Sequence, residues 1–186
     1  MPRRQTPLTI PCLWLVSDAR TDAVLESALQ RLPRGAGLVF RHYHLPAPDR
    51  AARFRVLARL CRRRGLVAVW AGAPRTARAL GADGCYGPPE LLASGPDLLR
   101  LVTVHSLREL AAAQRARADA VLVSPVFPTR SHPGAPGLGP LRWLAIARAS
   151  TVPAIALGGM TRLRARRLPS HGWAAIDGLA SAVRRP

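Results

Sequence analysis

Eight short apolar segments, each followed by a stretch with helical spacing, constrain the fold of this chain of 186 residues more than any other feature. Apolar runs of this length bounded by turn residues are typical of buried strands, which we expect at 12–17, 37–42, 65–72, 82–86, 98–104, 118–124, 152–159 and 173–177. The spacing between them predicts helices at 21–32, 48–64, 74–80, 89–93, 106–118, 140–149, 161–168 and 178–184. Capping residues or first-turn prolines support several of these helices: Asp49, Pro74, Ser106 and Pro140.

Strands that are apolar throughout, rather than at alternate positions, indicate a parallel sheet covered on its outer face. A closed (β/α)8 TIM barrel is the most economical arrangement of eight such units, so we expect an α/β fold of this type. The chain is short for a barrel, for which about 250 residues are typical, and must therefore have few insertions. A doubly wound open sheet is the alternative, but no GxGxxG sequence follows the first strand. We expect a single domain over 1–186, with residues 1–10 as a flexible N-terminal extension.

The formal net charge of +18 raises the question of nucleic-acid binding. All 28 basic residues are Arg, and the chain contains neither Lys nor Asn, which a GC-rich genome explains without a binding role. The arginines are also dispersed along the chain, so nucleic acid is not an expected partner. The absence of Lys excludes chemistry that depends on a lysine Schiff base.

The cysteines and the hydropathy pattern indicate the cellular compartment. Cys12, Cys61 and Cys85 show no CxxC or metal-ligand spacing, which favours a reducing compartment. The apolar stretch near the start is short and broken by Pro11, and no segment approaches the about 18 apolar residues of a membrane span. We therefore expect a cytoplasmic protein without a membrane partner.

The segment 124–139, SPVFPTRSHPGAPGLG, is the longest connection in the predicted barrel. Chemistry in such barrels takes place at the carboxyl ends of the strands, and a connection of this length is usually functional or disordered. Because it follows a predicted strand of a packed scaffold, we expect it to be ordered and to cover the barrel mouth. Its His132 is a candidate catalytic acid or base, since histidine titrates near neutral pH.

Residues after the last two strands predict a phosphate site. Backbone amides freed by Gly158, Gly159 and Gly178 could converge on an anion, although a tight turn is the structural alternative for the glycine pair. Asp177 would repel a phosphate unless it is protonated, bridged by a metal or turned aside, and its alternative role is to cap the last helix. His42 and His44 follow the second strand, and we expect one at the barrel mouth and the other on the outer surface.

Three segments together carry a family resemblance: SPVFPTRSHPGA (124–135), VPAIALGGM (152–160) and GWAAIDGLA (172–180). They resemble the carboxyl half of the thiamine phosphate synthase and TenI family, and the likeness continues more weakly through LWLVSD, VFRHY and GADG. The resemblance implies a (β/α)8 barrel in thiamine biosynthesis. The synthases join a hydroxymethylpyrimidine diphosphate to a thiazole phosphate and release diphosphate, so these two small phosphorylated molecules are the expected partners.

The resemblance also implies roles for individual residues. Arg41 would hold the diphosphate as a catalytic residue, and the hydroxyls of Thr129 and Ser131 would contact the phosphates. Gly158 and Gly159 would hold the thiazole phosphate. The remaining candidate substrate-binding positions stand at the ends of predicted strands: Thr103, Ser124, Asp177 and Gly178.

This chain departs from the family at several of these positions. Val39 and Tyr43 stand where the synthases have Gln and Lys beside Arg41. The synthases hold Mg²⁺ through two aspartates, whose positions fall here at Gly72 and near Leu91. Magnesium is thus possible by resemblance, but the expected carboxylate ligands are absent; substitutes would be Glu90 or Asp83, the latter expected at the start of its strand, and we assign no metal ligand.

Three further positions leave the activity open. His132 replaces a lysine of the synthases, and Asp177 a serine; the catalytic His of TenI-type tautomerases corresponds here to Pro125. Three functions remain: a synthase with a degenerate diphosphate and Mg²⁺ half-site, a TenI-like thiazole tautomerase or a divergent isomerase of a phosphorylated ligand, and a non-catalytic protein that binds the thiazole phosphate.

Overall fold

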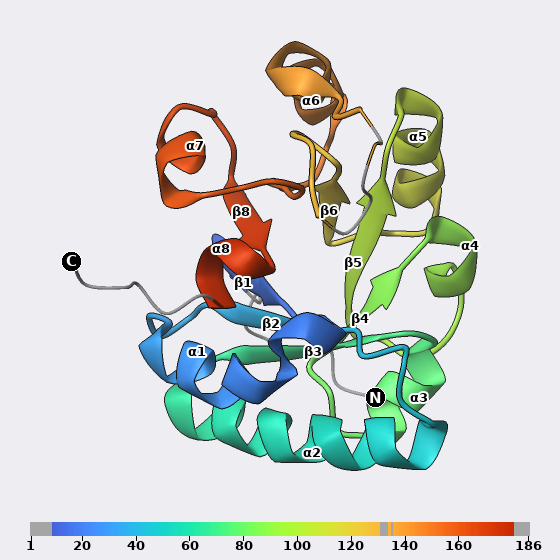
Figure 1. Cartoon of the computed structure of the whole chain (residues 1–186). Helices are drawn as coiled ribbons and strands as arrows, with labels where there is room; N and C mark the ends of the chain where they lie inside the picture. The colour runs from blue at the N-terminus through green and yellow to red at the C-terminus, as the bar shows by residue number, and fades with distance from the viewer. Residues whose placement is uncertain (1–8, 131–133, 135, 181–186) are drawn as a thin grey trace, which may run out of the picture.

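The computed structural model describes residues 9–130, 134 and 136–180. Its centre is a closed barrel of eight parallel strands in sequence order (Figure 1). The strands are β1 (Leu13–Val16), β2 (Gly37–Phe40), β3 (Val67–Ala71), β4 (Gly84–Gly87), β5 (Leu99–Val104), β6 (Ala120–Val123), β7 (Ala154–Ala156) and β8 (Gly172–Ala175). The pairing of β8 with β1 closes the barrel. The predicted fold and all eight predicted strands are confirmed; six strands lie within their predicted ranges and are shorter, β4 extends one residue further to Gly87, and β8 begins one residue earlier at Gly172.

Helices surround the barrel (Figure 1). They are the 3-10 helix η1 (Ala19–Val24), α1 (Leu25–Arg31), α2 (Ala47–Arg64), α3 (Pro74–Ala79), α4 (Pro89–Leu92), α5 (Leu107–Arg115), α6 (Gly139–Ala149), α7 (Arg162–Arg166) and α8 (Asp177–Ala180). The helix predicted over 21–32 is divided between η1 and α1, and residues 181–184 of the last predicted helix lie outside the described residues.

Both faces of the strands are buried, which explains their continuous apolar sequences. Alternate side chains, such as Trp14, Val39 and Leu122, fill the barrel interior. The intervening ones, such as Phe40 and Val121, pack beneath the helices. A parallel sheet buried on both sides thus has no polar face to impose a period of two on the sequence.

Local signals at helix starts agree with the structure in most cases. Ser106 is the N-cap of α5 and accepts a hydrogen bond from the Glu109 amide. Pro74 and Pro140 lie in the first turns of α3 and α6. Asp49 lies in the first turn of α2, not at its N-cap, because that helix begins earlier, after Pro46.

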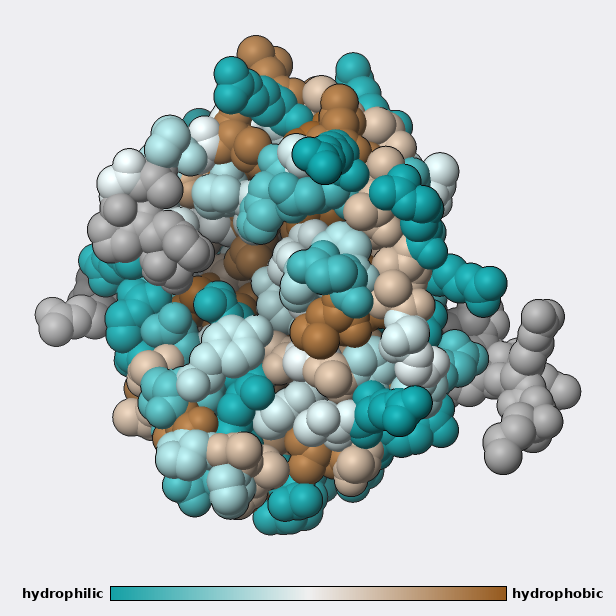
Figure 2. All heavy atoms as spheres, turned by 90° about the vertical axis from the view of Figure 1, so that its right-hand side faces the viewer, coloured by the Kyte–Doolittle hydropathy of each residue, from teal (hydrophilic) through white to brown (hydrophobic). Residues whose placement is uncertain are grey.

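The outer surface is mixed in character. On the face seen in Figure 2, hydrophilic side chains lie scattered among hydrophobic ones, and neither kind forms one continuous patch. Among the helices that the structure describes, none is long and apolar enough to cross a membrane. Cys61 and Cys85 are buried, and burial raises their thiol pKa to about 12 and about 11, so both remain protonated thiols near neutral pH.

Candidate functional site

A cavity of about 180 Å³ lies at the carboxyl ends of β7 and β8. Its walls come from three segments that are distant in sequence: Pro128–Arg130, Leu157–Thr161 and Ala175–Gly178. The structure therefore brings together five of the predicted phosphate-binding residues, namely Thr129, Gly158, Gly159, Asp177 and Gly178.

Two of the three glycines that line this cavity, Gly158 and Gly159, are required by the backbone conformation. Gly158 has a φ of +96°, and a Cβ atom there would lie 2.6 Å from the Cα of Pro125. Gly159 has a φ of +60°, and its Cβ would lie 2.6 Å from the carbonyl oxygen of Pro128. The tight turn is therefore real, and it lets the segment after β6 lie directly on the loop after β7.

Hydrogen bonds attach the start of the long segment after β6 to that loop. The Val126 amide donates to the Leu157 carbonyl at 2.8 Å, and the Phe127 amide donates to the Gly158 carbonyl at 3.1 Å. These two bonds continue the pairing of β6 with β7 past the strand ends. Ser131 and His132, predicted to act from the same segment, lie outside the described residues.

A second cavity, of about 380 Å³, adjoins the first over the centre of the barrel. The two share Thr129, Leu157, Gly158 and Ile176. The other polar side chains around the second cavity come from the ends of β2, β4, β5 and β6: Arg41, Tyr43, Tyr86, Thr103, His105 and Ser124. Three of the predicted substrate-binding residues, Arg41, Thr103 and Ser124, thus line one hollow with the shared Thr129.

Tyr86 and His105 also line this cavity, although no role is predicted for either from the sequence. Burial raises the pKa of Tyr86 to about 12, so its phenol stays protonated and can donate a hydrogen bond. His105 has its Nδ1 2.5 Å from the Ser124 carbonyl oxygen. Because a carbonyl oxygen only accepts, Nδ1 of His105 is the donor in this contact.

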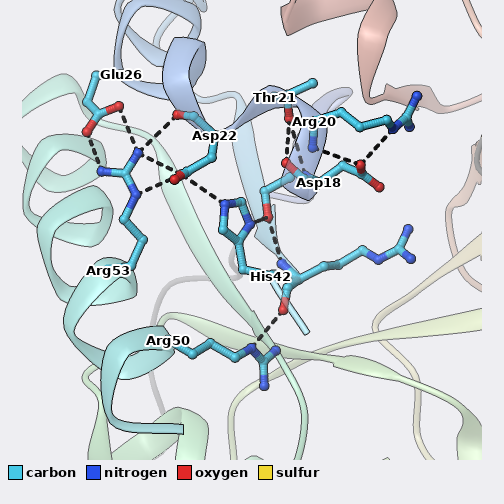
Figure 3. A network of polar contacts seen from close by, with 10 residues as sticks. Asp18, Arg20, Thr21, Asp22, Glu26, His42, Arg50 and Arg53 are labelled. Carbon is cyan, nitrogen blue, oxygen red and sulfur yellow. Dashed lines mark hydrogen bonds and ion pairs between the residues drawn. The ribbon is translucent and has the colours of Figure 1, made fainter. Parts of the chain in front are cut away.

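Arg41 is held at both of its backbone polar groups (Figure 3). Its amide donates to Ser17 Oγ at 2.8 Å, and its carbonyl accepts from Arg50 Nε at 2.7 Å. The guanidinium of Arg41 lies 5.6 Å from the ring centroid of Tyr43, which also lines the cavity.

The two histidines after β2 do not divide between mouth and outer surface as expected. Arg41 and Tyr43 line the larger cavity, whereas neither His42 nor His44 does, and the ring centroids of the two histidines lie 5.0 Å apart. His42 is buried and stacks on Phe40 at 4.6 Å. The expectation was wrong because the chain does not stay extended after Arg41: His42 has a φ of +32° and a turn follows, so the side chains do not alternate as on a strand.

Asp177 is the first residue of α8, and its carboxylate pairs with an arginine of η1, the helix after β1. Arg20 places NH1 3.3 Å from Asp177 Oδ2 and Nε 2.8 Å from Asp18 Oδ1; Figure 3 shows the Asp18 pair. Burial raises the pKa of Asp18, but hydrogen bonds from Arg20 lower this pKa by a larger amount, so the net shift is downward. Asp177 is therefore turned towards a cation that partly neutralises it beside the cavity.

The side chains present do not fit a magnesium site of the synthase type. Gly72 and Leu91 stand at the two positions discussed above, and neither has a ligand atom in its side chain. Asp83 lies before β4, where its Oδ2 accepts from the Ala68 amide at 2.9 Å, so it is at the opposite end of the barrel from the cavities. Within 9–130, 134 and 136–180, no three His, Cys, Asp or Glu side chains are grouped as metal ligands.

Comparisons with known proteins agree with this architecture. The thiamine-phosphate synthase of Mycobacterium avium is 32% identical over 190 residues, covering 91% of this chain and 83% of that protein. The bifunctional protein ThiM/ThiE of Symbiobacterium thermophilum is 32% identical over 184 residues; the match covers 92% of this chain but only 37% of that longer protein.

Among solved structures, thiamine phosphate pyrophosphorylase from Pyrococcus furiosus has the same fold, with a TM-score of 0.79 at 23% identity over 94% of this chain and 89% of that one. The family model described as thiamine monophosphate synthase, TMP-TENI, matches residues 13–181. Since this match spans all eight strands of the barrel, the chain belongs to the thiamine monophosphate synthase (TMP-TENI) family.

Proposed function

We propose that this protein binds a thiazole phosphate and a hydroxymethylpyrimidine diphosphate at the barrel mouth and joins them as thiamine phosphate synthases do. The observation that carries the proposal is the continuity of the two cavities through Thr129, Leu157, Gly158 and Ile176. Two ligands bound in adjoining cavities would meet at these shared residues. Holding two reactants in contact is a large part of what an enzyme contributes to such a reaction.

The smaller cavity is proposed to take the thiazole phosphate. Its turn at Gly158 and Gly159 exposes backbone to the ligand, and Thr129 adds a hydroxyl. The larger cavity is proposed to take the pyrimidine, whose ring suits walls formed by Tyr86, Pro88 and Ile176.

Arg41 is proposed to stabilise the departing diphosphate, because a guanidinium binds phosphate oxygens in a bidentate manner. We route no step through a metal, because the residues present do not fit one. The charge that develops on the leaving group is therefore stabilised by arginines: Arg41 lines the larger cavity, and Arg20 pairs with Asp177 in the wall of the smaller one.

A TenI-like isomerase is the second candidate, and one observation favours it. His105 lines the larger cavity, where an imidazole can move a proton on a thiazole, although it does not occupy the position of the TenI histidine. Binding of the thiazole phosphate without turnover is the third candidate.

The test is an incubation of the purified protein with both substrates, with and without Mg²⁺, followed by chromatography for thiamine phosphate. We expect product, and we expect Arg41→Ala to abolish it while Arg55→Ala, a matched change on the exposed face of α2, leaves it intact. No product at high enzyme concentration would exclude the synthase. Isomerisation of the thiazole phosphate alone would then support the second candidate, and binding without turnover the third.

A further inference from the structure

A chain of hydrogen bonds runs from η1 to the backbone of Arg41 through two buried side chains (Figure 3). Asp22 Oδ1 lies 2.9 Å from His42 Nε2, and His42 Nδ1 lies 2.8 Å from Ser17 Oγ. Ser17 Oγ then accepts from the Arg41 amide at 2.8 Å. Ser17 is fully buried and His42 is 1% exposed, so solvent cannot substitute for any of these partners.

The two ends of this chain have fixed roles. The Arg41 amide can only donate, so Ser17 Oγ accepts from it and keeps its own proton available for His42 Nδ1. The ionised carboxylate of Asp22 can only accept, so His42 Nε2 carries a proton. In the neutral imidazole, which burial favours, Nδ1 is then unprotonated and accepts from Ser17 Oγ.

The charged groups around His42 are consistent with this form. Burial lowers the pKa of His42, and the hydrogen bond and charge of Asp22 offset only part of that shift, while His44 and Arg53 lower it further. Burial raises the pKa of Asp22, but hydrogen bonds from Arg53 and His42 outweigh it, so the net shift is downward and the carboxylate is ionised.

The network is anchored in α1 and α2, the helices outside the barrel next to β2. Arg53 of α2 donates to Asp22 Oδ1 at 2.8 Å and also pairs with both carboxylate oxygens of Glu26 on α1. These contacts hold the Asp22 carboxylate at the point where it meets His42.

His42 also has a φ of +32°, in the left-handed region that a non-glycine residue occupies at a cost of about 1–2 kcal/mol. Its two hydrogen bonds and its stack on Phe40 offset this strain. A strained conformation held by surrounding contacts is typical of sites where geometry matters for function.

We propose that His42 is a positioning residue, which acts through Ser17 to fix the backbone of Arg41 and so aim its guanidinium at the diphosphate. This inference rests on the proposed function of Arg41. Arg50 holds the Arg41 carbonyl from the other side, so removal of the Ser17 bond leaves one of two attachments. A small displacement of a substrate-positioning group weakens binding and catalysis without unfolding the protein.

The first test does not depend on the proposed function. Two-bond ¹H–¹⁵N correlation spectra of the labelled full-length protein report the protonation of each imidazole nitrogen. At pH 7 we expect the His42 ring to be neutral with the proton on Nε2. A ring protonated on Nδ1 would overturn the proposal, since Ser17 could not then donate to it.

The second test measures the binding of inorganic diphosphate by calorimetry. We expect His42→Phe, which keeps the aromatic stack, to weaken binding by about tenfold or more, as for the loss of a positioning contact. His42→Asn should restore binding to within about threefold of the parent, because its Oδ1 can accept from Ser17 and Asn tolerates a positive φ. His44→Phe, an exposed neighbour, should bind as the parent does.

A third variant guards against a folding defect in His42→Phe. Ser17→Ala breaks the same chain with a smaller change, and we expect the same loss of affinity, with no further loss in the double variant because both act on one network. Normal diphosphate binding by His42→Phe or Ser17→Ala would overturn the positioning role alone. Failure of the unaltered protein to bind diphosphate would instead overturn the proposed role of Arg41, and with it the positioning role of His42.

Discussion

The guanidinium carbon of Arg50 lies 3.9 Å from the ring centroid of Trp70, which joins α2 to the outer face of β3. The same guanidinium lies 4.8 Å from the Tyr43 ring and donates to the Ala71 carbonyl at 2.5 Å. With its bond to the Arg41 carbonyl, Arg50 thus connects the ends of β2 and β3 beneath the larger cavity.

We predict that Arg50→Lys lowers the free energy of unfolding by about 1–2 kcal/mol, since an ammonium cannot reproduce the planar stack and the two directed bonds together. Urea unfolding followed by circular dichroism measures this. Arg55→Lys on the exposed face of the same helix is the control and should stay within about 0.5 kcal/mol of the parent. Equal values for the two variants would show that the Arg50 contacts contribute nothing specific.

Replacement of Asp177 by serine should strengthen the binding of inorganic phosphate. The change removes a negative charge from the wall of the smaller cavity and releases Arg20 from one of its two carboxylates. We expect an increase in affinity of about threefold to tenfold, as for a charge near a protein surface. Calorimetric titration would show it, and the effect should shrink at high salt.

The charge-matched control is Asp97→Ser, on an exposed loop before β5 at the opposite end of the barrel from the cavities. It should leave phosphate affinity unchanged at moderate ionic strength. Weaker phosphate binding by Asp177→Ser would mean that Asp177 contributes favourably, for instance by holding Arg20 in place.

A methyl group at Gly158 should destabilise the fold more than one at Gly81. Both glycines have positive φ, +96° and +69°, so alanine is strained at either position. At Gly81 nothing lies within 4 Å of the new Cβ, and we expect a loss of about 1–2 kcal/mol from backbone strain alone.

At Gly158 the new Cβ would also collide with the backbone of Pro125, and we expect a total loss of about 2–4 kcal/mol. Thermal and urea unfolding of the two variants side by side would measure the difference. Losses of equal size would indicate that the segment after β6 can move away from the loop after β7 at little cost.

Acid should weaken the fold in part through His42. Its pKa is lowered in the folded protein, so below the unfolded value of about 6.5 the unfolded chain takes up a proton that the folded chain does not. The free energy of unfolding therefore falls as the pH drops from the unfolded pKa towards the folded one. One proton corresponds to a slope of up to about 1.4 kcal/mol per pH unit.

His42→Asn should reduce this slope between pH 6.5 and pH 5, measured by urea unfolding at a series of pH values, because Asn does not titrate. His171→Asn, at an exposed site, should keep the parent slope. If the slope of His42→Asn equals that of the parent, His42 is not the group that takes up the proton.

The residues at the mouth divide into those that the sequence could identify and those that it could not. Arg41, Thr103, Ser124, Gly158 and Asp177 each stand at the carboxyl end of a predicted strand, and the carboxyl ends of parallel strands meet at one end of a barrel. Their assembly around two adjoining cavities therefore follows from strand order alone. Tyr86 stands at the end of β4 by the same rule, although no feature of the sequence singles it out.

Arg50, Arg20 and His42 could not be identified in this way. Arg50 lies within a helix, and its approach to the strand ends depends on how α2 packs against β3. Arg20 and Asp177 are 157 residues apart, and only the closure of β8 on β1 brings them together. His42 and His44 were expected on different sides because the local pattern does not show that the chain turns after Arg41.

The sequence by itself determined the barrel, because apolar runs without alternation specify strands buried on both faces and eight strand–helix units specify how they close. It also identified Gly158 and Gly159 as candidates for a tight turn or an anion site after the seventh strand. The tertiary structure alone decided how charges are partnered at the mouth and which side chains hold Arg41. Those contacts join segments whose relative position is set by packing across the whole barrel, and no local pattern of residues encodes that position.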